Sequence, residues 1–373
     1  MTIPMPFGDS ALWAATGRVS GCACVNMFGR ATNVDSGVAT DLHDGANATT
    51  DLDVLVIPTA ARVHAIVSTD ATDVTGIGTL TLTGQPADTQ TVTIGAKVYT
   101  FQTTLTDADG NVKIGANASG TIDNLIAAIN LAAGAGTTYA ASMTANAIDV
   151  EAAAGAGDTM TLWDHSSAAI ATTDTADNTA WGAANTVDGT GARTVRVYGL
   201  KTWASKETYE DINLHGAVAV NTANSYVMIN RMEVLTKGGT NVNKGVITAT
   251  AATDSTVSAQ INADVGKTLS TVLGVPSLQT AYISNYYGAV VKPAAALSAK
   301  LTLLANPEAG TEDTKFVTQH VLGLDTTGTS VLRHSFNPYL AISGPAIIKL
   351  QADADAADSD ISGGMDVILL DNS

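Results

Sequence analysis

The feature that most constrains the fold is a series of short runs in which apolar and polar residues alternate. After residue 188 such runs follow one another, with Gly, Asn, Asp or Pro between them; examples are RTVRVYG (193–199), GVITAT (245–250) and AIIKLQA (346–352). A spacing of about 8–12 residues with turn residues between runs is typical of antiparallel sandwiches and barrels. We therefore predict a mainly β chain whose largest part is an antiparallel, jelly-roll-like β-sandwich.

The acidic residues favour the same fold class. The chain holds 29 Asp but only 6 Glu, together with 34 Gly. Asp favours turns and helix caps, whereas Glu favours helix interiors, so this bias is typical of a loop-rich β protein. Hydrophobic residues make up 45% of the chain, which is too many for a disordered one.

The charge excludes several kinds of partner. Lys and Arg number 18 against 35 Asp and Glu, so the net charge is −17, and a nucleic-acid partner is not expected because phosphate contacts need a basic surface. No stretch approaches the roughly 18 apolar residues of a membrane helix, and the first residues lack the features of a secretory signal. We expect no membrane partner.

The chain divides into three predicted regions. Residues 1–50 read as an extended N-terminal arm, because Pro and Gly interrupt every periodic run. Residues 51–75 hold only two strand-like runs, too few for a stable unit, so we assign them with 189–373 to one β-sandwich. Residues 76–188, here called the acidic module, are then a small α+β domain inserted in a loop of the sandwich, which loop entropy tolerates.

The acidic module has its own pattern of elements. Residues 90–101 (QTVTIGAKVYTF) predict a β-hairpin with a two-residue turn at Gly95 and Ala96. Residues 119–134 predict a helix capped by Ser119 or Thr121, because apolar residues recur there at helical spacing. Eleven acidic residues against two lysines give the module a net charge of −9, so we expect it to be well solvated.

No motif for catalysis, cofactor or metal binding stands out. A disulfide between Cys22 and Cys24 would be strained, so we predict two free thiols. No two of the six histidines have metal-ligand spacing, and the sequence lacks a phosphate-binding loop and a nucleophile elbow. We therefore predict no catalytic, cofactor-binding or metal residues and no enzyme activity, although carboxylate pairs assembled in space stay an open alternative.

The Asp-rich run 353–360 is either a solvated loop or a weak cation site.

Several segments carry a resemblance to known proteins. They are GTGARTVRVYGL (189–200), ETYEDINLHGAVAVNTANSYVMINRMEVL (207–235), GTNVNKGVITATAATDSTVSAQI (239–261) and VPSLQTAYI (275–283). In their residues and in their order along the chain, these segments resemble a family of virion structural proteins of tailed bacteriophages, and together they cover about half of the chain. Two segments of the inserted region also resemble a module of phage head and tail appendage proteins. They are TLTLTGQPADTQTVTIGAKVYTF (79–101) and DNLIAAINLAAGAG (123–136).

The resemblance implies a virion component, and electrostatics favours one position on the particle. A charge of −17 would be repelled by packaged DNA, so we expect a capsid decoration or vertex protein on the exterior surface of the virion. The expected partners are the major capsid protein or other virion proteins and further copies of the chain, with a trimer matching the symmetry of shell axes. Two alternatives stay open: a tail, collar or baseplate component, and a host-glycan-binding adhesin.

Three aromatic residues of the arm are the candidate partner-binding residues. Phe7, Trp13 and Phe28 are the largest apolar side chains in residues 1–50, and an extended segment holds its partner through a few such anchors. The alternative is that they fold back onto their own sandwich. On the first interpretation, deleting residues 1–30 leaves a folded β protein that no longer joins particles.

Overall fold

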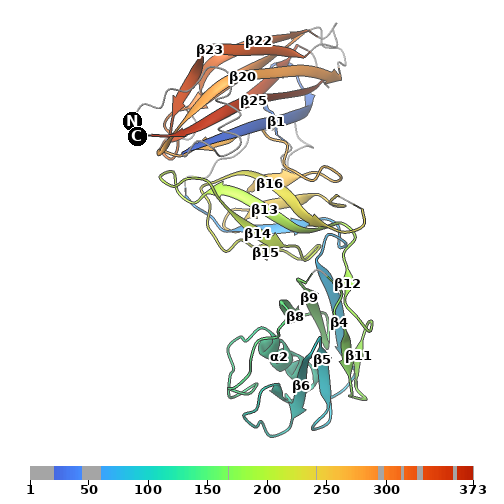
Figure 1. The fold of residues 1–373 in the computed structure, drawn as a ribbon. Coiled ribbons are helices and arrows are strands. Elements are labelled where there is room, and N and C mark those ends of the chain that lie inside the picture. The colour runs from blue at the N-terminus through green and yellow to red at the C-terminus, as the bar shows by residue number, and fades with distance from the viewer. Residues whose placement is uncertain are drawn as a thin grey trace.

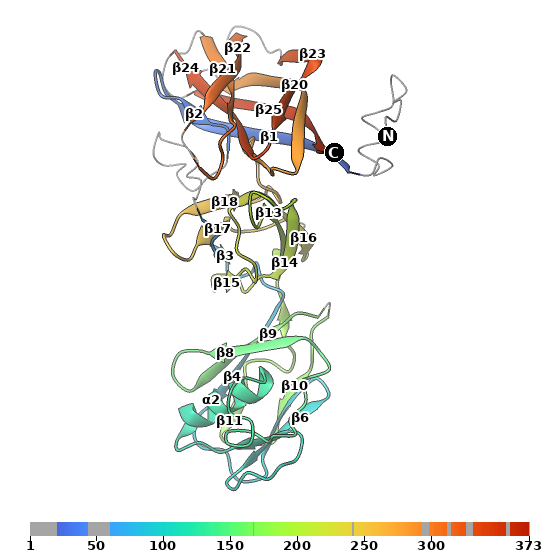
Figure 2. The ribbon, with the colours of Figure 1, turned by 90° about the vertical axis from the view of Figure 1, so that its left-hand side faces the viewer.

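The computed structural model describes residues 21–43, 60–166, 168–240, 242–292, 298–311, 315–325, 331–355 and 359–372. Figures 1 and 2 show three bodies in a row: a terminal sandwich that holds the C-terminus, a middle sandwich, and residues 76–188 at the far end. Antiparallel sheets dominate, so the prediction of a mainly β chain is confirmed. No helix within the described ranges is long and apolar enough to cross a membrane.

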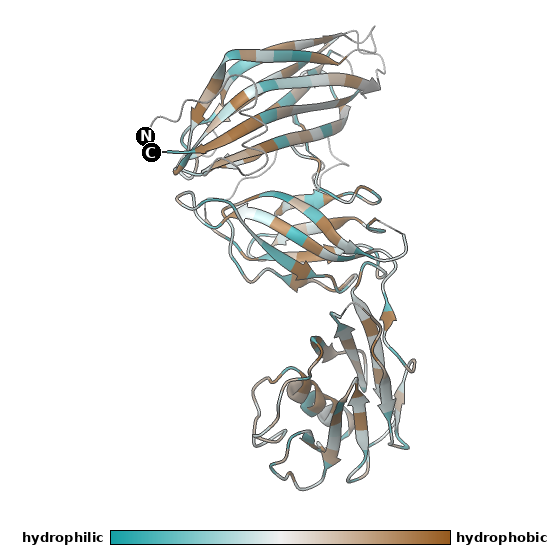
Figure 3. Cartoon of the chain, in the orientation of Figure 1, coloured by the Kyte–Doolittle hydropathy of each residue, from teal (hydrophilic) through white to brown (hydrophobic). Residues whose placement is uncertain are grey.

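The terminal sandwich packs two sheets face to face. One sheet has the order β1 (Cys22–Val34), β25 (Ser359–Asp371), β20 (Gln279–Lys292) and β23 (Leu332–Ser343). The other has the order β19 (Leu273–Val275), β24 (Ala346–Ala354), β21 (Ser298–Asn306) and β22 (Val317–Asp325), and β2 (Thr40–Asp41) also pairs with β24. Aliphatic side chains from both sheets fill the space between them. Figure 3 shows the alternation of apolar and polar residues along these strands.

The first described segment corrects the prediction of an extended arm for residues 22–34. Residues 22–34 form β1, which pairs antiparallel with β25 from Cys22 opposite Leu370 to Val34 opposite Ser359. Met27 and Val34 are buried in the core of the terminal sandwich. A glycine-rich segment lacks obvious periodicity, but this one forms a strand because β25 offers an edge to which its backbone hydrogen-bonds. A deletion of residues 1–30 would therefore remove most of a strand of this sheet.

The middle sandwich is smaller and has its own core. One sheet has the order β14 (Thr208–Asn213), β13 (Ala192–Leu200) and β16 (Met228–Lys237), and the other has the order β15 (Val220–Asn221), β3 (His64–Ser68), β17 (Ile247–Ala251) and β18 (Val257–Ile261). The pairing of β3 with β17 agrees with the inference that the strands before residue 76 join sheets formed after residue 188.

The single predicted sandwich is thus two sandwiches. Residues 64–68 and 192–261 enclose one core, and residues of β1, β2 and β19–β25 enclose another. A third apolar cluster, which includes Leu200, Met228, Val272 and Ile347, contains residues of both sandwiches and joins them. Strand periodicity does not reveal which strands share a core, so the sequence could not separate the two.

Residues 76–188 form two sheets and one helix. One sheet has the order β10 (Thr172–Asp174), β5 (Thr91–Ile94), β6 (Lys97–Gln102) and β7 (Asn111–Lys113). The other has the order β11 (Thr179–Trp181), β4 (Gly76–Leu82), β9 (Thr159–Asp164) and β8 (Val150–Ala154), with β12 (Val187–Asp188) also on β4. The helix α2 (Ala118–Ile129) buries Ile122 and Leu125 among these strands.

Local features of this region follow the sequence closely. β5 and β6 form the predicted hairpin, and Gly95 takes a φ of +60° at its turn. The helix is present, but its cap is Asn117 rather than Ser119 or Thr121, because the Asn117 side chain accepts from the Gly120 N–H at 2.8 Å. Thr121 instead donates its hydroxyl to Gln85.

Candidate functional site

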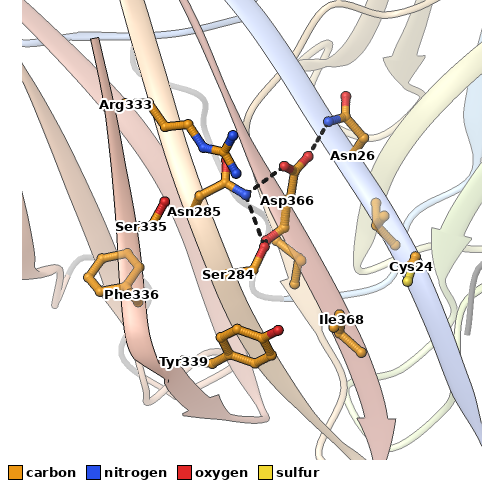
Figure 4. Close-up of a pocket in the computed structure, with 12 residues that line it drawn as sticks. Cys24, Asn26, Ser284, Asn285, Arg333, Ser335, Phe336, Tyr339, Asp366 and Ile368 are labelled. Atoms are coloured by element: carbon orange, nitrogen blue, oxygen red, sulfur yellow. Dashed lines mark hydrogen bonds between the residues drawn. The ribbon is translucent and has the colours of Figure 1, made fainter. Parts of the chain in front are cut away.

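A groove on the outer face of the terminal sandwich is the candidate functional site. It lies across β1, β25, β20 and β23 and has a volume of about 670 Å³. Ligand pockets commonly have volumes of about 300–1,000 Å³ and combine apolar walls with a few placed polar groups. The groove has this composition, because Phe336, Tyr339 and Ile368 line it together with Asp366 and Arg333 (Figure 4).

Strand alternation places polar side chains on this face. In β1 the Met27 side chain enters the core, so the neighbouring Asn26 faces the groove. In β25 Met365 and Val367 are buried, and Asp366 between them faces outward. Asn26 and Asp366 are opposite each other in the strand register, and the Asn26 amide donates to the Asp366 carboxylate.

An irregularity in β20 adds two more polar groups. The register of β20 shifts between Ile283 and Asn285 against both of its neighbours, which is the mark of a β-bulge. The bulge turns Ser284 and Asn285 toward the groove. Asn285 Nδ2 donates to Asp366 Oδ2 at 2.7 Å, and the Ser284 hydroxyl donates to the Asp366 backbone carbonyl at 3.3 Å. Two amides therefore hold the Asp366 carboxylate in one orientation.

The β23 side of the groove is cationic and aromatic. Arg333 and Ser335 come from the strand itself, and Phe336 and Tyr339 come from a segment where its register against β20 is broken. Figure 4 shows the Arg333 side chain directed toward Asn285 and Asp366. Tyr339 is 49% exposed. A ligand in the groove would meet an aromatic surface and both a donor and an acceptor of charge-assisted hydrogen bonds.

The cysteine of the groove is not an activated nucleophile. Burial, and then the Asp366 carboxylate, raise the pKa of the Cys24 thiol above its usual value. A raised pKa keeps the thiol protonated at neutral pH, and the thiolate is the reactive form. Cys22 and Cys24 are not joined by a disulfide, as predicted from their spacing.

Of the three candidate partner-binding residues, one lies in the described part of the chain. Phe28 lies in β1, two residues beyond Asn26, and is 36% exposed; it does not line the groove. Its backbone pairs with Gly364 of its own sandwich, which favours the alternative that this residue folds back onto its own body. Phe7 and Trp13 lie outside the described residues.

Two carboxylates of the Asp-rich run 353–360 have partners within the sandwich. Asp353 pairs with Lys300 at 2.7 Å and accepts from the Gly37 N–H at 3.2 Å. Asp355 accepts from the Ser298 N–H at 2.9 Å. Asp353 and Asp355 are therefore engaged by neighbouring groups of the sandwich, and Asp358 lies outside the described residues.

The sequence offered little sign of the groove. Its lining comes from residues 24–26, 284–285, 333–339 and 366–368, which are brought together by strand pairing alone. One signal was present: Asp366 is the charged residue inside the apolar run MDVILL (365–370). An isolated carboxylate on the polar face of a strand marks a surface, but it does not reveal which side chains lie opposite.

Comparison of the sequence with family models, with curated proteins and with solved structures found no match.

Proposed function

We propose that this chain is a non-enzymatic structural protein on the exterior of a tailed-phage virion, a capsid decoration or vertex protein that binds the shell through its terminal sandwich. The proposal combines the resemblance of residues 189–283 to phage virion proteins with the strand order of the terminal sandwich and the groove on its outer face.

The observation that most supports the proposal is the strand order of the terminal sandwich. If β1, β2 and β20–β25 are numbered one to eight along the chain, the two sheets read 1-8-3-6 and 2-7-4-5. This interleaved order is that of a jelly roll, an architecture of viral capsid and lectin domains. The order supports a jelly-roll terminal sandwich, with β19 as an additional strand on β24.

The same numbering supports a nested arrangement of the other two bodies. The middle sandwich lies in the connection between β2 and β20, and residues 76–188 lie in the connection between β3 and β13 of the middle sandwich. Every described ladder of β4–β12 joins two strands of residues 76–188. We infer that the acidic module is an insertion within an insertion.

The groove supports binding as the mechanism. Among its described lining residues Asp366 is the one carboxylate, and it is already bonded to Asn26 and Asn285. Glycoside hydrolysis uses a pair of carboxylates, with one of them free to take up or release a proton. A preorganised acceptor between an arginine and a tyrosine suits recognition of a loop from a neighbouring virion protein instead.

The arrangement of charge and shape supports an exterior position. Residues 76–188 carry a net charge of −9 and lie at the end of the molecule opposite the terminal sandwich (Figure 1). A chain attached by its terminal sandwich would project this acidic end into solvent, away from the phosphates of packaged DNA.

A host-glycan-binding adhesin is the second candidate. It is favoured by the exposed Tyr339 ring in the same groove as Asn285, Arg333 and Asp366, because sugar-binding sites combine a flat aromatic surface with polar groups. A tail, collar or baseplate component is the third candidate and shares the same binding surface.

Quantitative mass spectrometry of purified particles separates a decoration protein from a component present in few copies. We expect a decoration protein in hundreds of copies per particle, whereas a dozen or fewer copies would favour a tail or vertex position. A glycan array probed with the purified chain tests the adhesin. Absence of the chain from purified particles would refute the virion proposal.

A deletion of residues 1–20, which leaves β1 intact, tests the anchoring role of Phe7 and Trp13.

A further inference from the structure

Two histidines and one glutamate converge where residues 76–188 meet the middle sandwich. His165 directly follows β9 and Glu151 lies in β8, whereas His215 follows β14 of the middle sandwich. One donor atom from each of these side chains lies within 4.8 Å of the other two. The cluster therefore takes its donors from both bodies, and it shares no residue with the groove.

The distances between the donor atoms fit a metal ion. His165 Nε2 and His215 Nε2 are 3.1 Å apart, and Glu151 Oε2 is 3.9 Å from His215 Nε2. Two ligands at about 2.0–2.1 Å from a tetrahedral zinc ion lie roughly 3.3 Å from each other. The histidine pair is already near this separation, and the exposed Glu151 side chain needs only a small rotation.

A second carboxylate orients His165. Asp149 Oδ2 lies 3.3 Å from His165 Nδ1, on the side of the ring opposite His215. A carboxylate at this distance favours the tautomer with hydrogen on Nδ1, which leaves the Nε2 lone pair directed toward His215. Metal-binding histidines commonly have such a carboxylate behind them.

His215 is held in place by packing. Its side chain is buried, and its ring stacks on Trp163 with a centroid distance of 4.0 Å and an interplanar angle of 5°. The buried ring is therefore fixed with its Nε2 atom 3.1 Å from His165 Nε2.

A hydrogen bond between the two rings explains only part of this arrangement. One imidazole can donate to the other at 3.1 Å, but Glu151 Oε2 is then 3.9 Å from His215 Nε2, beyond hydrogen-bonding distance. An ion between the three donors would satisfy both histidines and the carboxylate at once.

We propose that His165, His215 and Glu151 bind one divalent transition-metal ion of the zinc class, which ties residues 76–188 to the middle sandwich. Two imidazoles and a carboxylate are a common zinc ligand set, and water would occupy the fourth position. Sequence reasoning predicted no metal site because these histidines are 50 positions apart. The proposal is independent of the function proposed above.

Isothermal titration calorimetry of the untagged, chelator-treated full chain with ZnCl₂ tests this site. We expect one zinc ion per chain, and an affinity that falls at least about tenfold in Glu151→Gln and in His165→Gln. Glu151 is exposed and His165 is more exposed than His215, and circular dichroism of both variants checks that the fold is kept. Co²⁺ added in place of zinc should give the intense visible absorption of a tetrahedral site, and His165→Gln should abolish it.

The matched control is His334→Gln. His334 stacks on His320 in the terminal sandwich with a centroid distance of 3.9 Å. The control substitution therefore removes a histidine from a second pair outside the proposed site. The control should bind zinc as the unaltered chain does. Absence of zinc binding, or binding that Glu151→Gln and His165→Gln leave unchanged, would overturn the proposal.

Discussion

The Asp73 carboxylate accepts a hydrogen bond from the Ala192 backbone N–H at 2.7 Å. Asp73 lies just before the chain enters residues 76–188, and Ala192 begins β13, where the chain has returned. The same carboxylate accepts from the Lys244 and Gly245 N–H groups and from the Ser68 hydroxyl. One fully buried side chain thus joins the outgoing and returning segments to the middle sandwich.

Replacing Asp73 should destabilise the middle sandwich strongly. We expect Asp73→Asn to lower the free energy of unfolding by about 3 kcal/mol, because an amide NH₂ would face backbone donors that lose their acceptor. Urea denaturation followed by circular dichroism measures this change. Asp177→Asn, on the exposed surface of residues 76–188, is the control and should change stability little. Equal stability of both variants would contradict the role of Asp73.

A buried ion pair attaches β2 to β24. Lys349 Nζ lies 2.8 Å from Asp41 Oδ1, and the exposed fractions of the two side chains are 4% and 0%. Asp41→Ala should cost about 3–5 kcal/mol of stability because it leaves a buried ammonium without its partner. The double variant Asp41→Ala with Lys349→Met should be more stable than Asp41→Ala alone. Additive effects in a double-mutant cycle would show that the two charges do not interact.

Stability should fall as the pH is lowered from about 6.5 to about 4. Burial, and then the nearby Arg62 charge, lower the pKa of His64 to about 4. The unfolded chain therefore takes up a proton at a pH where folded His64 stays neutral. Above pH 6.5 His64 is neutral in both states and adds no pH dependence, whereas between pH 6.5 and 4 protonation of the unfolded chain lowers the stability by about 3 kcal/mol in total.

Urea midpoints at pH 7, 6, 5 and 4.5 measure the pH effect. His64→Gln should make the dependence shallower because the amide does not titrate in this range. If the His64→Gln curve runs parallel to that of the unaltered chain, His64 is not the group responsible.

Close approach of β1 to the residue that follows β2 requires glycine at position 29. A Cβ atom on Gly29 would lie 2.2 Å from the Leu42 carbonyl oxygen. Gly29→Ala should therefore push β1 away from β2 and destabilise the terminal sandwich by about 1–3 kcal/mol. Gly323→Ala in β22, where a Cβ meets nothing within 4 Å, is the matched control. Thermal unfolding of the two variants provides the comparison.

Loss of the aromatic wall should weaken binding without affecting folding. Tyr339 is half-exposed in the groove, so Tyr339→Ala should keep the unfolding midpoint. On the proposed function it should lower the number of copies per particle at least tenfold, because aromatic anchors dominate binding surfaces. Val331→Ala, a similarly exposed residue just before β23 that does not line the groove, is the control. Equal occupancy of both variants would remove the groove from the binding surface.

The sequence by itself determined the local structure of this protein. Alternating runs became strands, Gly95 turned a hairpin because it tolerates positive φ, and Ile122 and Leu125 defined the buried face of helix α2. These features depend on residues within a few positions of one another, and their periodicity can be read along the chain.

The tertiary structure alone decided which strands are partners and which side chains meet. A strand edge accepts any other strand through the same backbone hydrogen bonds, so the sequence did not reveal that β1 pairs with β25 or that there are two sandwiches. The groove around Asp366 and the contact between His165 and His215 depend on such pairings. They arise where segments distant in sequence pack together, and no local pattern specifies that.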